Sequence, residues 1–267
     1  MKRIIFITVF CLVTLFMFGC GSTYSYRYKD SSKYQVGEAF FNKSDVKNIE
    51  IEWAGNRAEV TTYDGEEVHI YEEIDEDASE KYQLHYYLNN GTLYIEPCAS
   101  MYRFRYNFKV KKLHVELPTN MEKLDKFKLS LVSASGGISN LSSKDVDIES
   151  VSGSLSITDI DCDNIKVESV SGSLSIENIT ASKLRLNSVS GSVTLKKINA
   201  DVRMETVSGR IDIYIDEDSS FKIEKIEMVS GRFENEFGTN SQGDNPVSYS
   251  IETVSGSVKI HKESIGG

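Results

Sequence analysis

Cysteine and proline are scarce in this chain, and the shortage of cysteine excludes a disulfide-stabilised scaffold. Four cysteines occur in 267 residues, and Cys11 and Cys20 belong to the apolar N-terminal stretch. Only Cys98 and Cys162 remain, and two scattered thiols make neither a disulfide framework nor a metal site. Of the three prolines, Pro97 and Pro118 follow strand-like runs, where residues that end a strand are expected.

Positive charge and catalytic motifs are also lacking. The formal net charge of −10 at pH 7 argues against a nucleic-acid partner and against electrostatic binding to anionic lipid. The chain contains no nucleophile elbow, no glycine-rich phosphate loop and no His-Glu-x-x-His zinc pattern. The acidic segment 159–164 lacks the glycine and the bidentate glutamate of a calcium loop, which favours a solvated corner. The sequence therefore predicts no cofactor, no metal and no enzyme activity.

The N-terminus has the features of an export signal. Lys2 and Arg3 precede the apolar run Ile4–Phe18, and Met17-Phe18-Gly19-Cys20 resembles the lipobox of bacterial lipoproteins. That resemblance implies cleavage after Gly19 and a lipid on Cys20, which would hold the protein at the membrane outside the cytoplasm. An ordinary cleaved signal and an uncleaved anchor helix are the alternatives. We expect residues 1–19 to be the signal peptide and residues 20–35 to be a lipidated cysteine with a flexible tether.

The second half of the chain contains a short sequence repeat. Val-Ser-Gly occurs six times, beginning at Val151, Val170, Val189, Val207, Val229 and Val254, and the first three copies are evenly spaced. A degenerate copy, Val132-Ser133-Ala134, stands one such interval before the first. A fixed period of about 20 residues is typical of one short unit stacked many times.

Within each unit, apolar residues alternate with polar ones, which predicts strands with one buried face. The alternation changes parity at Ser-Val-Ser-Gly and again near Thr158-Asp159 and Glu177-Asn178. A strand changes face only where the chain bends, so we expect a corner at each of these points. Core positions carry polar residues twice in the unit around Val229, at Glu224 and Asn235. We interpret the stacked serines as a row of structural hydrogen bonds.

Residues 36–120 are rich in strands but lack the regular repeat. Strands are predicted at Asn48–Trp53, Arg57–Thr62, Glu67–Glu72, Tyr82–Leu88, Thr92–Glu96, Phe104–Val110 and Lys112–Leu117. The acidic run Glu72–Glu80 is interpreted as a solvated loop. This part is either an irregular start to the same stack or a small capping sheet, and a stack needs its first layer covered. We expect one domain over residues 36–263, with regular repeats over 121–263.

One aromatic stretch is a candidate contact surface. It consists of Tyr102, Arg103, Phe104, Arg105 and Tyr106, followed by Asn107 and Phe108. In a strand, the aromatic side chains share one face and the two arginines share the other. The simpler interpretation is an ordinary core-facing strand, and the alternative is a strip that stacks on a sugar or on a partner protein.

The order of segments resembles a known bacterial family. It contains Ile49–Trp53, Ala58–Thr61, Asp64–Val68, Gly91–Ile95 and Leu113–Pro118, followed by the Val-Ser-Gly series. This order is similar to the domain-of-unknown-function family labelled "putative adhesin". The resemblance implies an all-β fold, a right-handed single-stranded parallel β-helix of about 19 residues per coil on an exported protein. It implies no catalytic or binding residues.

Two classes of function follow from these features. The first is a lipid-anchored envelope protein without catalytic activity, which contacts cell-wall glycan or an envelope protein, including a membrane partner in an envelope-stress response. The second is a carbohydrate-active enzyme, because parallel β-helices also support that chemistry. Such an enzyme needs clustered acidic residues on one face, and the outward positions of the regular units are mostly Ser, Thr, Lys and Asp.

Overall fold

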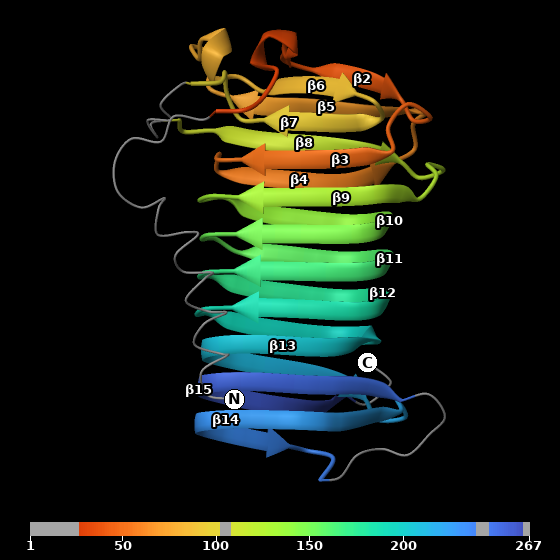
Figure 1. Cartoon of the computed structure of the whole chain (residues 1–267), viewed down its shortest axis with the longest axis vertical. Helices are drawn as coiled ribbons and strands as arrows, with labels where there is room; N and C mark the ends of the chain where they lie inside the picture. The colour runs from red at the N-terminus through yellow and green to blue at the C-terminus, as the bar shows by residue number, and fades with distance from the viewer. Residues whose placement is uncertain (1–26, 102–107, 239–245, 264–267) are drawn as a thin grey trace.

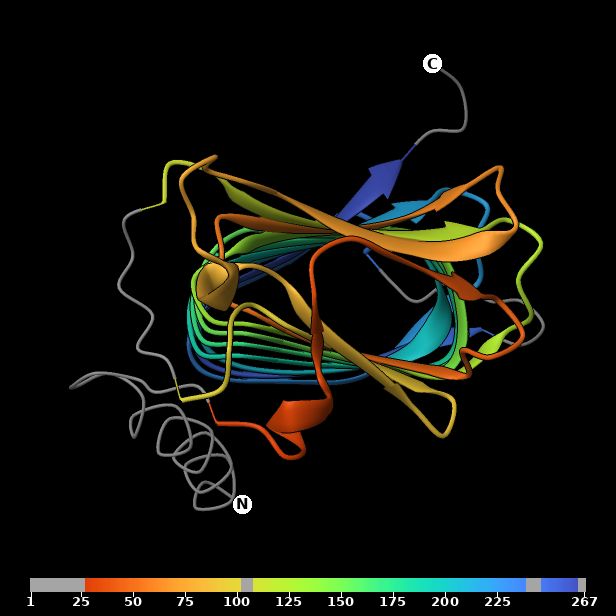
Figure 2. The same cartoon turned by 90° about the horizontal axis from the view of Figure 1, so that it is seen from above.

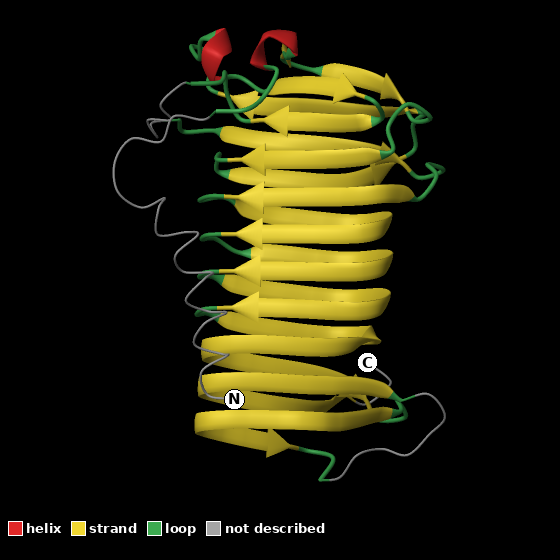
Figure 3. Cartoon of the chain, viewed as in Figure 1, coloured by secondary structure: helices red, strands yellow, loops and turns green. Residues whose placement is uncertain are grey.

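The computed structural model of the protein describes residues 27–101, 108–238 and 246–263, and these ranges fold into a tall stack of strands (Figures 1 and 3). The strands are β1 (Gln35–Val36), β2 (Ala39–Asn42), β3 (Asn48–Trp53), β4 (Arg57–Tyr63), β5 (Glu67–Ile74), β6 (His85–Asn89), β7 (Thr92–Glu96), β8 (Lys111–Pro118), β9 (Leu124–Leu131), β10 (Ser135–Ser150), β11 (Leu155–Ser169), β12 (Ser173–Ser188), β13 (Ser192–Asp216), β14 (Phe221–Asn235) and β15 (Val247–Glu263). Two short 3-10 turns, η1 (Ser31–Lys33) and η2 (Glu80–Tyr82), lie at the N-terminal end. In the described ranges, no helix has the length and apolar character needed to cross a bilayer.

The repeat unit sets the spacing of the stack. Gly136 pairs with Leu155, and Leu155 pairs with Leu174, so successive units lie side by side in parallel and are offset by one repeat. The long strands β10, β11 and β12 turn a corner at Asn140, Asp159 and Asn178, where φ is 57°, 56° and 55°. The view along the stack shows two facing walls joined at both edges (Figure 2). The second predicted change of parity therefore falls at a corner residue with left-handed backbone angles, which Asn and Asp adopt more readily than most residues.

The alternating apolar residues fill the space between the two walls. The residues three positions before each Val-Ser-Gly form one buried row, with Ile148, Val167, Leu186, Met204 and Ile251 all fully buried. Their strands pair in register, so each side chain packs against its equivalents in the neighbouring layers. One continuous hydrophobic core thus extends through the stack, as the two-residue alternation predicts.

The Val-Ser-Gly tripeptides line up along one edge of the stack. Gly172 has φ of 122°, and a Cβ on this residue would overlap the carbonyl oxygen of Gly153 in the next layer. Only glycine fits this combination of backbone angle and close approach. The serine hydroxyls donate along the stack, from Ser171 Oγ to Val151 O at 3.2 Å and from Ser190 Oγ to Val170 O at 3.3 Å. The structural interpretation of this serine row is confirmed.

The last two layers are not stacked in chain order, contrary to the expectation that successive segments lie above one another. The sheet order is β13-β15-β14, so the final strand is inserted between its two predecessors (Figure 1). β15 offers Tyr249, Ile251, Val258 and Ile260 to the core, and all four are buried. In β14, Asn235 lies opposite the core residue Ile260, and a bulge places Ile223 opposite Tyr249 and leaves Glu224 exposed. The more apolar strand therefore takes the site covered on both sides, and the less apolar one takes the end.

The N-terminal part both continues the stack and caps it. β3 pairs in parallel with β9 and β7, while β4 pairs in parallel with β10 and β8. Above these layers, β5 and β6 pair antiparallel with β8 and β7, and β2 and β1 pair antiparallel with β5 and β6. We call this antiparallel layer, β1, β2, β5 and β6 with their connections, the cap.

Two predicted strands differ from the structure. The strand expected at Tyr82–Leu88 begins only at His85, because residues 80–82 form η2. The strand expected at Phe104–Val110 is wrong for Phe108–Val110, which have no strand pairing before β8 begins at Lys111. The backbone N–H groups of Lys109 and Val110 instead donate to the side chain of Asp75. Residues 104–107 lie outside the described ranges.

Candidate functional site

The residues that the sequence singles out for contact lie largely outside the described part of the chain. These are the lipidation candidate Cys20 and the contact candidates Tyr102, Arg103, Phe104, Arg105 and Tyr106. Phe108, the first described residue after this segment, lines a cleft beside the cap. The structure thus places the end of this segment at a candidate site that the sequence does not identify.

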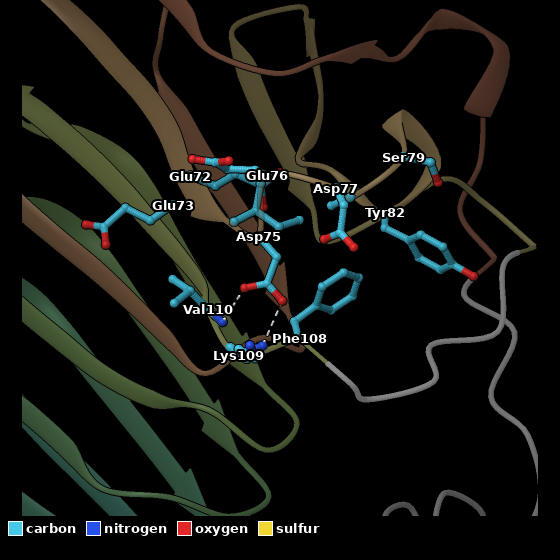
Figure 4. Close-up of a pocket in the computed structure, with 12 residues that line it drawn as sticks. Glu72, Glu73, Asp75, Glu76, Asp77, Ser79, Tyr82, Phe108, Lys109 and Val110 are labelled. Atoms are coloured by element: carbon cyan, nitrogen blue, oxygen red, sulfur yellow. Dashed lines mark hydrogen bonds between the residues drawn. The ribbon is translucent and has the colours of Figure 1, made fainter.

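The cleft lies between the end of β5 and the segment that leads into β8, and its volume is about 1050 Å³ (Figure 4). We call it the cap cleft. Its walls carry five acidic residues and two aromatic rings: Glu72, Glu73, Asp75, Glu76, Asp77, Tyr82 and Phe108. The acidic run interpreted from the sequence as a solvated loop therefore forms one wall of this cleft. The volume is in the range of sites that take small molecules or short oligomers.

A buried ion pair supports the base of the cap cleft. Lys111 Nζ lies 2.6 Å from Glu72 Oε2 and donates to Tyr82 O at 2.7 Å, and the lysine side chain is fully buried. The same ammonium group lies 4.7 Å from the centre of the Trp53 ring. Burial raises the pKa of Glu72 and lowers the pKa of Lys111, while the attraction between the two charges opposes both shifts. The pair fixes β5 against β8, because removing either partner would leave the other charge buried alone.

Two more carboxylates of the cleft are used in structural contacts. Asp75 accepts hydrogen bonds from the N–H groups of Lys109 at 2.9 Å and Val110 at 3.0 Å, as the dashed lines in Figure 4 mark. Glu73 Oε1 lies 2.7 Å from His114 Nε2. Glu76 and Asp77 have no such role among the described contacts, so they are the carboxylates available to a ligand. Tyr82 and Phe108 meet edge to face, with 5.7 Å between ring centres.

A second feature of the cap is a ladder of stacked rings on its outer surface, formed by Phe40, His69, Tyr71 and His114. Successive ring centres lie 4.1, 4.7 and 4.5 Å apart. Both nitrogens of His69 face carboxylates, with Glu116 at 2.9 Å and Glu38 at 2.7 Å. The rings cover one another's inner faces, and Phe40, which is 54 % exposed, is the ring at the outer end of the ladder. We therefore assign the ladder to joining β2, β5 and β8.

A buried carboxyl lies on the other side of the cap, at the end of β7. Glu96 is only 6 % exposed, and its Oε2 has no hydrogen-bond partner among the described residues. Burial, reinforced by the nearby charge of Glu52, raises the pKa of Glu96 to about 9. The side chain is therefore protonated at neutral pH. Tyr28 lies close by and donates from its hydroxyl to Cys98 O at 3.0 Å, which closes this side of the cap.

The remaining sequence candidates have structural roles. Cys98 and Cys162 are buried free thiols, and burial raises the pKa of Cys162 to about 11. Asp161 and Asp163 are at a corner and flank Lys123 at 3.6 and 3.2 Å, as expected for a solvated corner. No group of three or more His, Cys, Asp or Glu side chains in the described ranges is arranged to hold a metal ion.

Sequence reasoning missed the cap cleft because its parts are far apart in the chain. Glu76 and Asp77 belong to an acidic run, and Tyr82 and Phe108 belong to segments interpreted as strands. The pairing of β5 with β8 brings them together, and that pairing is one of the antiparallel pairings of the cap, which the regular repeats do not contain. The one signal in the sequence was Lys111, a charged residue at a position that continues the buried alternation of Leu113 and Val115.

Comparisons with solved structures find chains of low sequence identity that align with most of this chain. A protein of Bacteroides fragilis described as a "putative adhesin" is 17 % identical, covers 85 % of this chain and 97 % of its own, and has a TM-score of 0.49. A "putative cell adhesion protein" of Clostridium sporogenes is 13 % identical, with coverages of 86 % and 100 % and a TM-score of 0.40. A "putative lipid binding protein" of Parabacteroides distasonis is 16 % identical, with coverages of 88 % and 97 % and a TM-score of 0.41.

A search of curated proteins finds no match. The family model described as Toastrack DUF4097 matches residues 46–264, which include the strands β3 to β15 and leave out β1 and β2 of the cap. That match covers most of the chain and agrees with the resemblance found in the sequence. The chain therefore belongs to the Toastrack DUF4097 family, a domain-of-unknown-function family to which the "putative adhesin" label applies.

Proposed function

We propose that this protein is an exported, lipid-anchored β-solenoid that binds a component of the cell envelope without catalysing a reaction. Cys20 would carry the lipid. The tether expected over residues 20–35 would be shorter than that range, because Tyr28, Tyr34 and Gln35 already contact the cap. Residues 36–263 would form one right-handed β-helical domain with about 19 residues per coil. The parallel, in-register pairing of successive repeats supports this architecture. The ligand we favour is a cell-wall glycan, and an envelope protein is the alternative.

The cap cleft is the observation that carries this proposal. It combines two acidic side chains that have no hydrogen-bond or ion-pair partner among the described residues, Glu76 and Asp77, with the rings of Tyr82 and Phe108. Rings of this kind pack on the apolar faces of sugars, and carboxylates accept hydrogen bonds from hydroxyl or amino groups. The acidic walls favour a neutral or cationic ligand over an anionic one. The use of Glu72, Glu73 and Asp75 in structural contacts supports binding over catalysis.

Binding by the cap cleft can be tested with the form that lacks residues 1–20. This form is screened against peptidoglycan fragments and other envelope glycans, and the affinity of each hit is compared with that of Glu76→Gln/Asp77→Asn. Loss of charged hydrogen bonds should weaken binding about tenfold or more. The matched control is Glu217→Gln/Asp218→Asn, which neutralises two adjacent acidic residues at the corner after β13. Equal binding by all three forms would contradict the proposal, and hydrolysis of a glycan would favour the enzyme alternative.

Lipid anchoring is tested separately in cells that incorporate a labelled fatty acid. The full chain should become labelled and partition into detergent, and Cys20→Ser should abolish both properties. Labelling that persists in Cys20→Ser would contradict this part of the proposal without affecting the cap cleft.

A further inference from the structure

A second cavity lies toward the end of the stack opposite the cap, where the insertion of β15 interrupts a corner. At this edge the layer before it turns through a single corner residue of β13, Lys197, with φ of 49°. The next layer is built from two separate segments. One wall ends at Asp216, where β13 ends, and the other begins at Val247, where β15 begins (Figure 1). Described residues of both segments line a cavity of about 370 Å³, which we call the corner pocket.

The inner end of the corner pocket is apolar except for one hydroxyl group. The residues there are Ile198, Ile215, Phe221 and Tyr249, each at most 9 % exposed. Tyr249 takes a core position that Val202 takes in the layer before it, and its larger ring meets Phe221 edge to face. The Tyr249 hydroxyl has no hydrogen-bond partner in the part of the chain that the structure describes. A buried hydroxyl without a partner is unfavourable, so a ligand that supplies one gains affinity.

The rim of the corner pocket carries one charge of each sign. Lys197 is exposed and Asp216 is partly exposed, and both line the pocket. Neither side chain has a hydrogen-bond or ion-pair partner among the described residues, whereas the neighbouring Lys196 lies 3.6 Å from Glu263. An ammonium group and a carboxylate at one opening are complementary to a ligand that carries a carboxylate and an ammonium group of its own.

We propose that the corner pocket binds a small zwitterion of the class of a free amino acid, whose apolar side chain ends in a hydrogen-bonding group, as in tyrosine. Lys197 binds the carboxylate of the ligand and Asp216 binds its ammonium group. The side chain of the ligand fills the apolar inner end, where its polar tip meets the Tyr249 hydroxyl. The volume is in the range of sites that take small molecules. A zwitterion has no net charge, so the net charge of −10 on the chain does not oppose its binding.

The two charges of the rim are tested by measuring the binding of L-tyrosine and two analogues to the purified full chain by ligand-detected nuclear magnetic resonance. Tyramine lacks the carboxylate, and 3-(4-hydroxyphenyl)propionate lacks the ammonium group. Lys197→Gln should weaken L-tyrosine about tenfold or more and leave tyramine unchanged, whereas Asp216→Asn should weaken L-tyrosine and leave the propionate unchanged. The matched controls Lys183→Gln and Asp218→Asn neutralise exposed residues outside the pocket. No binding of L-tyrosine, equally tight binding of either analogue by the wild type, or an equal loss in the controls would overturn the proposal.

The inner end is tested by the preference between two amino acids. The wild type should bind L-tyrosine about two- to tenfold more tightly than L-phenylalanine, and Tyr249→Phe should remove this preference while it still binds L-phenylalanine. Asn199→Trp places a large side chain on the rim and should abolish binding. Thr180→Trp places the same side chain on the exposed residue that pairs with Asn199 in the preceding layer, and should not. Circular dichroism verifies that each variant is folded. Equal affinity of the wild type for the two amino acids, or unchanged binding by folded Asn199→Trp, would overturn the proposal. Loss of binding in Glu76→Gln/Asp77→Asn would also overturn it, because the ligand would then lie in the cap cleft.

Discussion

At the scale of single residues, Glu96 ties the stability of the cap to pH. Its carboxyl is buried, with one oxygen unpartnered among the described residues, and its pKa rises from an ordinary value of 4.5 to about 9. Between these two values the folded protein holds a proton that the unfolded chain releases. Stability therefore falls as the pH rises through this window, and the contribution is fully favourable only below the unfolded pKa.

Replacing Glu96 with Gln should remove this dependence. We expect the free energy of unfolding of the wild type to fall, relative to Glu96→Gln, by at most about 1.4 kcal/mol per pH unit between pH 5 and 9. Urea unfolding at several pH values measures the difference. Glu122→Gln, which removes the same charge from a side chain that is 91 % exposed, controls for net charge. A constant difference between the wild type and Glu96→Gln would show that Glu96 is ionised in the folded state.

The burial of Glu96 could not be predicted from the sequence. Glu96 follows Leu93 and Ile95 in a strand, and alternation alone predicts an outward, solvated carboxyl there. The side chain is buried because Tyr28 and Tyr34, which belong to a distant part of the chain, lie close to it and contribute to its surroundings. By contrast, the glycine and serine of each Val-Ser-Gly were predictable, because their roles depend on the next repeat at a fixed distance.

At the scale of elements, the last three strands show that a strand can be predicted from its own sequence while its place in the sheet cannot. Each strand was recognisable from its own alternation of apolar residues. Their order depends on which strand buries more apolar surface when strands cover it on both sides, and β15 buries more than β14 would. Glu224 and Asn235 were visible as exceptions in the sequence. They were the signal that β14 belongs at an end, but a repeat is naturally interpreted as stacking in chain order.

Disulfide trapping should confirm the order β13-β15-β14. Arg210 pairs with Ser257, and Ser257 pairs with Arg232, so these positions lie in three consecutive layers. We expect Arg210→Cys/Ser257→Cys and Arg232→Cys/Ser257→Cys to form a bond on mild oxidation, since neighbouring strands are about 4.8 Å apart. Arg210→Cys/Arg232→Cys spans two layers, about 10 Å, and should stay reduced. Thiol titration of the unfolded variants measures this, and efficient bonding of the last pair would instead indicate stacking in chain order.

At the scale of the whole molecule, the stack behaves as a series of layers that share one core. Each regular layer contacts only the layers above and below it, through ladder hydrogen bonds and the buried rows. In such an array, stability is close to a sum of layer terms and interface terms. The cap and β14 close the two ends and differ from the layers between them. The number of regular layers is therefore a variable that the fold tolerates, provided that the register of the corners is kept.

Removing one complete layer tests this property. Deletion of residues 155–173 joins Ser154 to Leu174, so β10 should pair with β12 as it now pairs with β11, and every Val-Ser-Gly stays in line. We expect a folded protein with a cooperative transition, less stable by about a few kcal/mol because one layer and one interface are lost. Deletion of residues 155–164 removes a shorter segment, but that segment is only half a layer. It would place Ile165 where Leu155 now lies and Val170 where Ile160 now lies, so the next Val-Ser-Gly would fall at the opposite edge of the stack and this variant should not fold. Far-ultraviolet circular dichroism and thermal unfolding compare the two. Equal loss of structure in both would mean that the layers are not interchangeable and that each depends on its particular neighbours.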